Sequence, residues 1–544
     1  MNLIDKMLYD IAPIRQEKRM VARNNIQKLN TAIKMNQAYG DVIDILRPDE
    51  KVTNSGYSHS GASRRKRFAK KWKYESGSSK RDIEMNRKVL RERSRDLAMN
   101  SPIGAAAVGT TRTSCVGQGL IPKPKIDYEY LGISKEEARK IEKTIQKEFR
   151  IWAESSLCDN NDLNNFYELQ QIAFMDWLRN GEEFVLIKYA EECEYMPYQL
   201  RIKLVEADRV SSPDSFEGEY DGYDKELKDS GNRIMNGVEI SKAGQVEAYY
   251  ISSVFPGDYE TETVKWKRIK KRGEKTGNPN ILHVFNAERG EQYRGVPFLA
   301  PVIETVKQLT RYTEAEIMAA VLNSMFGIFI TSTGGEDPLE FEGDDTDNET
   351  DETADEEIKV GSGTVHFLQP GESVTPVSVS HPNQNFDGFS KSMAKYIGAA
   401  LEIAPEVLLK EFRNNFSASK GALNESWRAF KMRRKWFVND FCQEIYELWF
   451  CEAVSKGRII APGFFNDVMI RKAYTNCTWN GPTQGQIDPG KEVNAASLRV
   501  KEGFSTREDE CAALNGSDYE DNVRTLENEN GLLKKVHDAL EGED

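Results

Sequence analysis

The sequence lacks the marks of three classes of protein. It has no run approaching the roughly 18 consecutive apolar residues that a membrane-spanning helix needs. Its first residues, Met1–Lys6, do not show the charged and then apolar layout of a secretory signal. Its five histidines are scattered and form no His or Cys/His ligand pattern, so the sequence offers no ligand set for the zinc ion of a zinc-dependent hydrolase. We therefore expect a soluble protein that works away from membranes and without a metal or cofactor.

Paired cysteines are also missing. The seven cysteines stand alone, without a Cys-x-x-Cys pair. Five of them lie in apolar or helical settings, namely Cys115, Cys158, Cys193, Cys442 and Cys451. We expect these to be reduced core residues in a reducing cytoplasm, with no disulfide framework.

Catalytic motifs are absent or incomplete. Gly485 to Lys491 has the spacing of a phosphate-binding loop, but Glu492 stands where a Ser or Thr hydroxyl must reach magnesium. The serine–lysine pattern at Ser417–Lys420 and the Lys275-Thr-Gly277 triplet occur in the wrong order for a penicillin-binding enzyme. We predict no enzymatic activity. A metal-dependent DNA-processing enzyme, or a helical scaffold that binds only proteins, remains the alternative.

Charge is distributed unevenly along the chain. Residues 1–100 hold 23 Lys and Arg against 12 Asp and Glu, a net charge of +11, so the whole-chain charge of −13 leaves −24 for the other 444 residues. The first hundred residues can therefore meet phosphate or an acidic partner, whereas most of the body would repel a polyanion sliding past it.

A dense basic run lies in the amino-terminal part, with Phe68 and Trp72 between its cations. The basic residues are Arg64, Arg65, Lys66, Arg67, Lys70, Lys71 and Lys73. Such residues neutralise phosphates while the rings stack on bases. The alternative is a solvated surface segment whose aromatic residues tuck into the body.

The central stretch runs from Gln292 to Ile330. Apolar residues recur at steps of three and four between Phe298 and Phe326, which predicts one helix of about 40 Å. They are Leu299, Val302, Ile303, Val306, Leu309, Thr313, Ile317, Ala320, Val321 and Met325. A helix this long is either the core of a bundle or a rod that packs beside copies of itself.

Other segments follow simpler patterns. Helices are predicted over 79–100, 134–155, 164–179, 386–403 and 420–453, and a strand over 183–189. In the first helix Ile83, Val89, Leu90 and Leu97 form the apolar stripe. Between 198 and 284 the period changes to two, which predicts a β-rich unit.

An acidic segment interrupts the second half of the chain. Glu336–Glu357 contains 13 acidic residues in 22 and no basic residue. Repulsion among these charges predicts a disordered loop. A metal site is the weaker alternative, because nothing rigid spaces the carboxylates.

Several short motifs follow one another along the chain. They are Arg91-Glu-Arg-Ser-Arg-Asp-Leu-Ala-Met-Asn100, Val116-Gly-Gln-Gly119, His283-Val-Phe285, Arg289-Gly-Glu-Gln-Tyr-Arg-Gly-Val-Pro297, the segment from Phe386 to Leu409, Asn415-Phe-Ser-Ala-Ser419, Trp479-Asn-Gly-Pro482, Ile487-Asp-Pro-Gly-Lys-Glu492 and Gly503-Phe-Ser-Thr506. In this order they resemble the lambda-like family of tailed-phage portal proteins, over roughly residues 57 to 510.

The resemblance implies an α+β, mainly helical subunit with a wing, a β-rich clip, a helical stem and a helical crown, assembling into a ring. Its implied parts are a basic, partly mobile arm (1–75), the wing with a candidate first stem helix (76–198), the clip (199–291), the stem helix (292–328), wing strands with the acidic loop 336–357 (329–385), the tunnel helix and loop (386–420), wing and crown helices (421–510) and an acidic tail (511–544).

The implied function is that of a portal, or head-tail connector. Twelve subunits would form a DNA channel at one capsid vertex for genome packaging and ejection. The implied partners are double-stranded DNA, the terminase large subunit, head-completion adaptor proteins, and capsid and scaffold proteins. The protein would reside in the virion after assembly in the host cytoplasm.

Candidate residues follow from this resemblance. Those expected at the channel are Lys410, Arg413, Asn414, Asn415, Lys420, Lys307 and Arg311, and the alternative is that their charges face a neighbouring subunit. Those expected to have structural roles are Arg294, Gly295, Pro297, Trp479, Gly481, Pro482, Asp488 and Pro489.

Overall fold

The computed structural model describes Asn25 and residues 76–191, 193–213, 231–256, 264–325, 328–332, 372–376, 385–412, 416–485 and 488–541. The chain divides into two compact units, Met1–Ser78 and Ser79–Asp544, and every labelled helix and strand belongs to the second. The basic run 64–73, the acidic segment 336–357 and residues 413–415 lie outside the described residues.

Helices come first in this unit. They are the π-helical η2 (Lys80–Glu84), α3 (Arg87–Asn100), α4 (Pro102–Cys115), α5 (Tyr128–Leu131), α6 (Lys135–Ala153), the short η3 (Ser156–Cys158) and α7 (Phe166–Asn180). Ser134 caps α6 by accepting a hydrogen bond from the Glu137 amide, while the Glu137 carboxylate accepts one from the Ser134 amide. The helices predicted over 134–155 and 164–179 are confirmed.

The apolar stripe predicted for the helix over 79–100 is partly wrong. Ile83 and Leu97 are buried, but Val89 is 45% exposed. In its place Arg87 and Arg91 face the interior. The reason is a buried carboxylate on the neighbouring strand, which sequence periodicity does not reveal.

Two antiparallel sheets follow. The first has the order β3-β2-β8, formed by Leu200–Val205, Glu182–Tyr189 and Ile281–Phe285. The second has the order β4-β5-β6-β7, formed by Arg233–Met235, Val238–Ile240, Val246–Ser252 and Trp266–Lys270. The β-rich character predicted between 198 and 284 is confirmed.

The first sheet joins parts that the sequence assigned to different domains. Leu200 pairs with Tyr189, and Phe285 pairs with Glu182, so β2 lies between two strands from beyond residue 198. The boundary expected at 198/199 therefore runs between strands of one sheet. The assignment of 199–291 to a clip stays a prediction.

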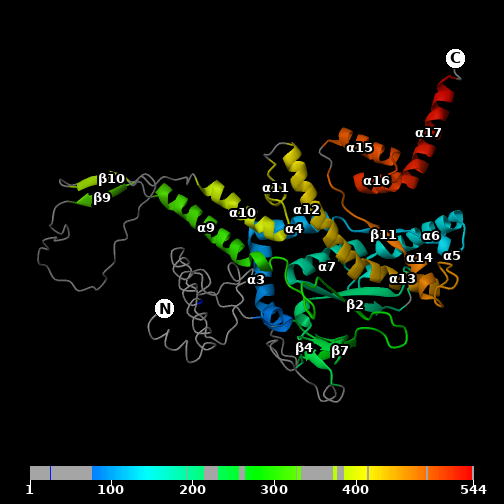
Figure 1. Cartoon of the computed structure of the whole chain (residues 1–544), viewed down its shortest axis with the longest axis horizontal. Helices are drawn as coiled ribbons and strands as arrows, with labels where there is room; N and C mark the ends of the chain where they lie inside the picture. The colour runs from blue at the N-terminus through cyan, green and yellow to red at the C-terminus, as the bar shows by residue number, and fades with distance from the viewer. Residues whose placement is uncertain are drawn as a thin grey trace, which may run out of the picture. The chain divides into compact units, whose positions relative to one another are not determined.

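The long helix is present. The 3-10 turn η5 (Ala300–Val302) leads into α9 (Ile303–Met325), which runs beside α10 (Phe386–Leu401) (Figure 1). Tyr312 on α9 stacks on Phe386, with ring centroids 5.8 Å apart. Within residues 299–325, the first half is buried at Leu299, Val302, Val306 and Leu309, whereas the second half exposes apolar residues, among them Ile317, Met318 and Val321. Beyond α9, β9 (Ile328–Ser332) pairs with β10 (Glu372–Pro376).

A second long helical run forms the centre of the core. It consists of α12 (Phe416–Phe437), a π-helical stretch η6 (Val438–Cys442) and α13 (Gln443–Ser455) (Figure 1). Its aromatic residues pack on α6 and α7: Phe149 lies edge-on to Trp449 at 4.9 Å, and Phe166 stacks on Phe441 at 5.9 Å. The aromatic residues of the helix predicted over 420–453 are thus largely buried. The short α11 (Pro405–Leu409) precedes this run.

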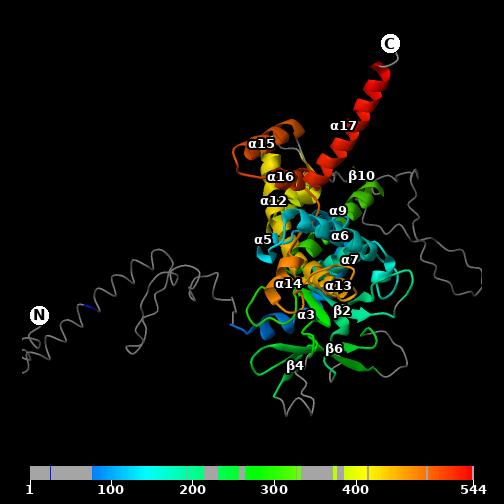
Figure 2. The same ribbon diagram turned by 90° about the vertical axis from the view of Figure 1, so that its right-hand side faces the viewer.

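The chain ends with further helices. They are α14 (Val468–Thr475), α15 (Pro489–Lys501), α16 (Arg507–Leu514) and α17 (Tyr519–Glu541), with strand β11 (Cys477–Asn480) pairing with β1 (Ile121–Pro124). In two perpendicular views α17 extends away from the other helices and strands (Figures 1 and 2). None of the described helices combines the length and hydrophobicity needed to cross a bilayer.

The cysteine prediction is only partly right. Cys115, Cys158 and Cys442 are buried, and Cys451 is partly buried. Cys193 is exposed, since it lies in a turn closed by a bridge to Met196 rather than in an apolar element.

Two carboxyl groups are placed unfavourably between α7 and β2. Burial and the nearby Glu206 raise the pKa of Asp176 to about 6, against the opposing effect of Arg179 and Arg95. Burial, then Asp176 and Glu206, raise the pKa of Glu183 well above its ordinary value, and its Oε2 has no hydrogen-bond partner. The fold therefore favours the neutral form of both groups.

We predict that Asp176→Asn stabilises the protein at pH 8 but not at pH 4. The pKa of Asp176 is about 6 in the folded protein and roughly 3.9 in the unfolded chain. The wild-type protein therefore loses stability as the pH rises from the lower to the higher of these two pKa values. The gain should be at most about 3 kcal/mol. Thermal unfolding at both pH values measures it, with the exposed Asp521→Asn as control. A destabilised D176N protein at pH 8 would contradict the argument.

Candidate functional site

The connector before the long helix is fixed by one buried arginine. Arg294 is fully buried, and its Nε donates to both carboxylate oxygens of Glu182 at 2.9 Å, while its Nη2 donates to Oε1 at 2.7 Å. Its remaining donors reach the carbonyls of Ala207 and Val210, each at 2.9 Å. The planar guanidinium thus links the strand β2, the segment after β3 and the start of the helical rod.

Other groups complete this charge cluster. Arg91 Nη2 donates to Glu182 Oε1 at 2.5 Å, His283 contacts Glu182 Oε2 at 3.0 Å, and the Gly295 amide donates to the same oxygen at 2.8 Å. Arg91 also pairs with Asp208 at 3.2 Å. Burial alone would raise the pKa of Glu182, but Arg294, His283 and Arg91 outweigh it and hold that pKa well below its ordinary value. Glu182 is therefore ionised in the fold.

The connector also requires glycine. A Cβ on Gly295 would lie 2.0 Å from the carbonyl oxygen of Gly181, and Gly181 has φ +87° with its own Cβ position 2.4 Å from Val296. Two chain segments cross here at backbone contact, which only residues without a side chain permit. Pro297 follows directly, and the Phe298 amide donates to the Leu178 carbonyl at 2.9 Å.

A second group of the expected structural residues surrounds a cavity of about 670 Å³ between α12, α15 and α16. Trp479, Gly481 and Pro482 line it, together with the channel candidate Lys420. A Cβ on Gly481 would lie 2.4 Å from Leu120 Cδ2, so a larger residue here would require the Leu120 side chain to shift. Arg434 fixes the loop by donating to the Pro482 carbonyl at 2.6 Å, and Asp488 with Pro489 begins α15 as its cap and first residue.

The channel candidates do not form one cluster. Lys307 and Arg311 lie one turn apart on α9, both exposed, and Lys307 is 3.6 Å from Asp96. Lys420 on α12 pairs with Glu492 at 2.6 Å. Lys410 ends α11 in the left-handed conformation (φ 54°) and is exposed. Arg413, Asn414, Asn415 and the basic-arm residues are among those not described.

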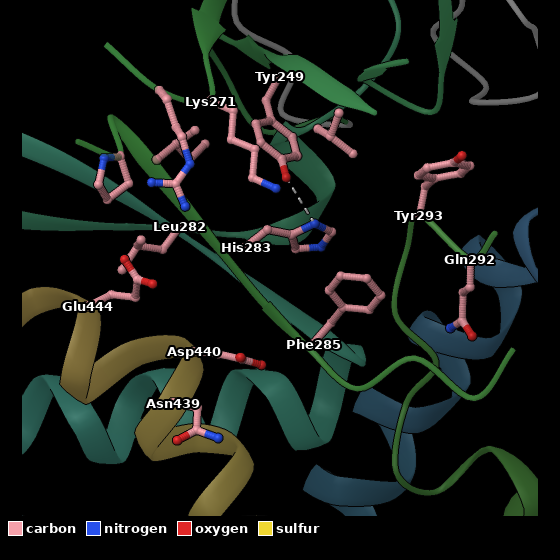
Figure 3. Close-up of a pocket in the computed structure, with 14 residues that line it drawn as sticks. Tyr249, Lys271, Leu282, His283, Phe285, Gln292, Tyr293, Asn439, Asp440 and Glu444 are labelled. Atoms are coloured by element: carbon pink, nitrogen blue, oxygen red, sulfur yellow. Dashed lines mark hydrogen bonds between the residues drawn. The ribbon is translucent and has the colours of Figure 1, made fainter. Parts of the chain in front are cut away.

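A further pocket of about 390 Å³ lies between β8 and the π-helical stretch of the long run. Figure 3 shows Asp440 and Glu444 on its helical wall, facing Lys271 and Tyr249 on the strand side. Tyr249 Oη lies 3.4 Å from His283 Nδ1, and the other ring nitrogen of His283 contacts Glu182. The series of contacts from Tyr249 through His283 to Glu182 resembles a proton relay in outline.

The pocket does not hold an activated nucleophile. Burial raises the pKa of Tyr249, so its hydroxyl stays protonated. Burial, against the contact with Glu182, lowers the pKa of His283, which stacks between Phe184 and Phe285 with centroids 4.2 Å from each. Among the described residues, His, Cys, Asp and Glu side chains nowhere gather in threes that could hold a metal ion.

Sequence reasoning missed the centre of the charge cluster. It singled out Arg294 and Gly295, but it did not recognise Glu182, Arg91 and His283 as their partners. The available signal was a Gly-Glu-Glu sequence at the start of a strand, together with arginines at 87 and 91 on one helical face.

We predict that Glu182→Gln destabilises the fold by about 3–5 kcal/mol, because it leaves Arg294 and Arg91 buried without their counter-charge. The adjacent Glu183→Gln is a matched control: its side chain is equally buried but favours the neutral form. Chemical denaturation of both variants at pH 7.5 measures the difference. An equal or larger loss in the Glu183 variant would show that charge pairing at 182 is not the cause.

Comparisons with known proteins give a consistent result. Residues 65–434 match the family model described as phage portal protein, lambda family. The chain is 26% identical over 448 residues to portal protein B of Escherichia phage lambda, covering 79% of this chain and 81% of that protein. It is 25% identical over 448 residues to the portal protein of Escherichia phage N15, with the same coverage of both chains.

Solved structures show only a distant likeness. The neck of the native gene transfer agent (GTA) particle gives a TM-score of 0.38 at 12% identity, covering 80% of this chain and 94% of that chain. The neck of the empty GTA particle gives 0.40 at 13%, covering 79% and 94%. TM-scores this low support no conclusion about function.

Proposed function

Because the chain belongs to the lambda family of phage portal proteins, we propose that twelve copies form a ring at one capsid vertex, through which double-stranded DNA passes during packaging and ejection. The match over residues 65–434 is the observation that carries the proposal. The ring would dock the terminase large subunit and head-completion proteins and contact capsid and scaffold proteins. It would assemble in the host cytoplasm and remain in the virion.

The charges support a channel with weak affinity for DNA. Each lysine contact to phosphate adds salt-dependent affinity and slows sliding. The chain beyond residue 100 carries −24, and Lys307 and Lys420 already have acidic partners. Only Lys410 and Arg311 among the described channel candidates have no ion pair with another described residue.

Exposed apolar residues support self-association. Ile317 and Met318 on α9 are 60% and 59% exposed, and Tyr396 on α10 is 72% exposed. If the protein functioned as a monomer, the exposed sides of α9 and α10 would be expected to be polar. In a ring, helices of adjacent copies would bury these apolar side chains.

We predict that the purified protein forms rings with an axial hole. Twelve subunits of 61.8 kDa correspond to roughly 742 kDa. Electron microscopy with mass measurement in solution tests this. A globular monomer would refute the portal proposal, and magnesium-dependent cleavage of plasmid DNA would favour the enzyme alternative.

We predict that Lys410→Ala combined with Arg413→Ala preserves ring assembly but impairs DNA retention or packaging several-fold, since two local phosphate contacts are lost. Packaged-genome length and particle yield measure the effect. Lys140→Ala with Arg150→Ala removes the same charge from the exposed face of α6 and serves as control. Normal packaging by the Lys410/Arg413 variant would show that these two residues do not make the proposed DNA contacts.

A further inference from the structure

The strand β7 has one edge without a partner strand. The second sheet has the order β4-β5-β6-β7, so β7 pairs with β6 on one side and ends the sheet on the other (Figure 1). Among the described residues no strand pairs with this outer side along Trp266–Lys270. The unpaired backbone groups of such an edge can accept a further strand.

The hydrogen-bond register shows which backbone groups are free. The carbonyl of Lys265 and the amide of Lys271 are both bonded to the β6 side, each at 2.8 Å. Because the direction of bonding alternates along a strand, the N–H and C=O groups of Trp266 and Arg268 point away from β6. Within the part of the chain that the structure describes, no acceptor lies on the outer side for these two amides.

The free edge is strongly basic. Residues 265–272 hold six Lys and Arg in eight positions and no acidic residue, in a chain whose net charge is −13. Arg268 is neutralised by the buried carboxylate of Glu239, with Nε 2.7 Å from Oε2. Lys265 and Lys267 form no ion pair with a described residue.

Lysines of the other sheet add to this charge. The two sheets pack against each other through residues that include Leu186 of β2 and Ile251 of β6. Lys203 lies opposite Leu186 and Lys267 lies opposite Ile251, so both lysines are on the sides of their strands that face the other sheet. Lys188 follows Leu186 on the same face of β2. Burial, then the charges of Lys267 and Lys203, lower the pKa of Lys188. Three lysines therefore gather at one margin of the pair of sheets.

Protection of the edge does not explain this arrangement. Lysine on an edge strand discourages pairing with copies of the same strand, and Lys267 alone would serve that purpose. Lys188 and Lys203 lie on other strands, and their charges repel that of Lys267. Like charges beside an open edge are stabilised by a negatively charged partner.

We propose that the outer edge of β7 accepts an extended acidic segment of another protein as an added strand. The backbone of that segment would bond to the outward groups of Trp266 and Arg268, while its carboxylates would meet Lys188, Lys203 and Lys267. Duplex DNA suits the same charges less well, because its phosphates offer no donors for the outward carbonyls. One chain carries the whole edge, so the inference goes beyond the proposed channel and does not require a ring.

Peptide binding to the full-length protein provides the first test. The wild-type protein should bind a fluorescein-labelled peptide of alternating Glu and Val, measured by anisotropy at low salt, and should not bind the corresponding Lys and Val peptide. Lys265→Ala/Lys267→Ala should weaken binding roughly fivefold, because two exposed ion pairs are lost. Lys140→Ala/Lys143→Ala removes the same charge from the exposed face of α6 and should bind as wild type does. Equal binding of the two peptides, or no binding of the acidic one, would overturn the proposal.

A matched pair of variants separates backbone pairing from attraction of charges. Arg268→Pro and Arg268→Ala both lose the ion pair with Glu239, but only the proline variant also loses the outward N–H. Proline is tolerated on an edge strand where its nitrogen faces solvent. Arg268→Pro should therefore bind the acidic peptide roughly tenfold more weakly than Arg268→Ala. Equal binding by the two variants would show that charge alone attracts the peptide, and the added strand would be refuted.

Hydrogen exchange of the wild-type protein, read at single residues, needs no variant. The acidic peptide should slow the Trp266 and Arg268 amides roughly tenfold or more and change the Lys267 amide little, because that amide is already bonded to β6. Slow exchange of the two outward amides before the peptide is added would show that the edge is already covered. Slowing by duplex DNA and not by the peptide would assign the edge to nucleic acid. Either result would overturn the proposal.

Solution mass distinguishes this inference from the proposed function. A protein that binds the acidic peptide at this edge but stays a monomer would refute the portal ring and leave the added strand standing. A ring whose outward amides are unaffected by the peptide would refute only the added strand.

Discussion

The buried carboxylate of Glu182 is the interaction on which the arrangement of this chain depends. It accepts hydrogen bonds from Arg294, Arg91 and the Gly295 amide, and it contacts His283. These groups come from α3 and from β8 with the connector that follows it, and both parts are distant in sequence from β2 and from each other. An unpaired charge at this depth would be costly, so each partner constrains where the others can lie.

This constraint explains how a long helix can begin at a defined point and direction. The connector carrying Arg294 crosses the Gly181 turn at backbone contact, and Leu299 and Val302 are buried directly afterwards. The rod is therefore held along its first half, where Tyr312 also stacks on Phe386. Its far half exposes the apolar side chains of Ile317 and Met318.

α17 is likewise held at its base. Its first turns contact α16 and form an ion pair with Arg139, and the residues from Thr525 to Lys534 are exposed. Lys123, which pairs with Asp518 at 2.7 Å and with Glu508, strengthens that base. In both helices the single chain leaves apolar side chains exposed, among them Ile317 on α9 and Leu526 on α17.

The sequence by itself determined the local elements and the family resemblance. The capping box at Ser134, the period of α9 and the alternation in β2 and β3 arise from neighbours within a few residues, which act in any context. Only the tertiary structure decided which charges are inside. Arg87 and Arg91 look like surface residues until Glu182 faces them, and Lys307 and Lys420 look free until Asp96 and Glu492 approach. Burial of a charge depends on partners distant in sequence, and no local pattern records them.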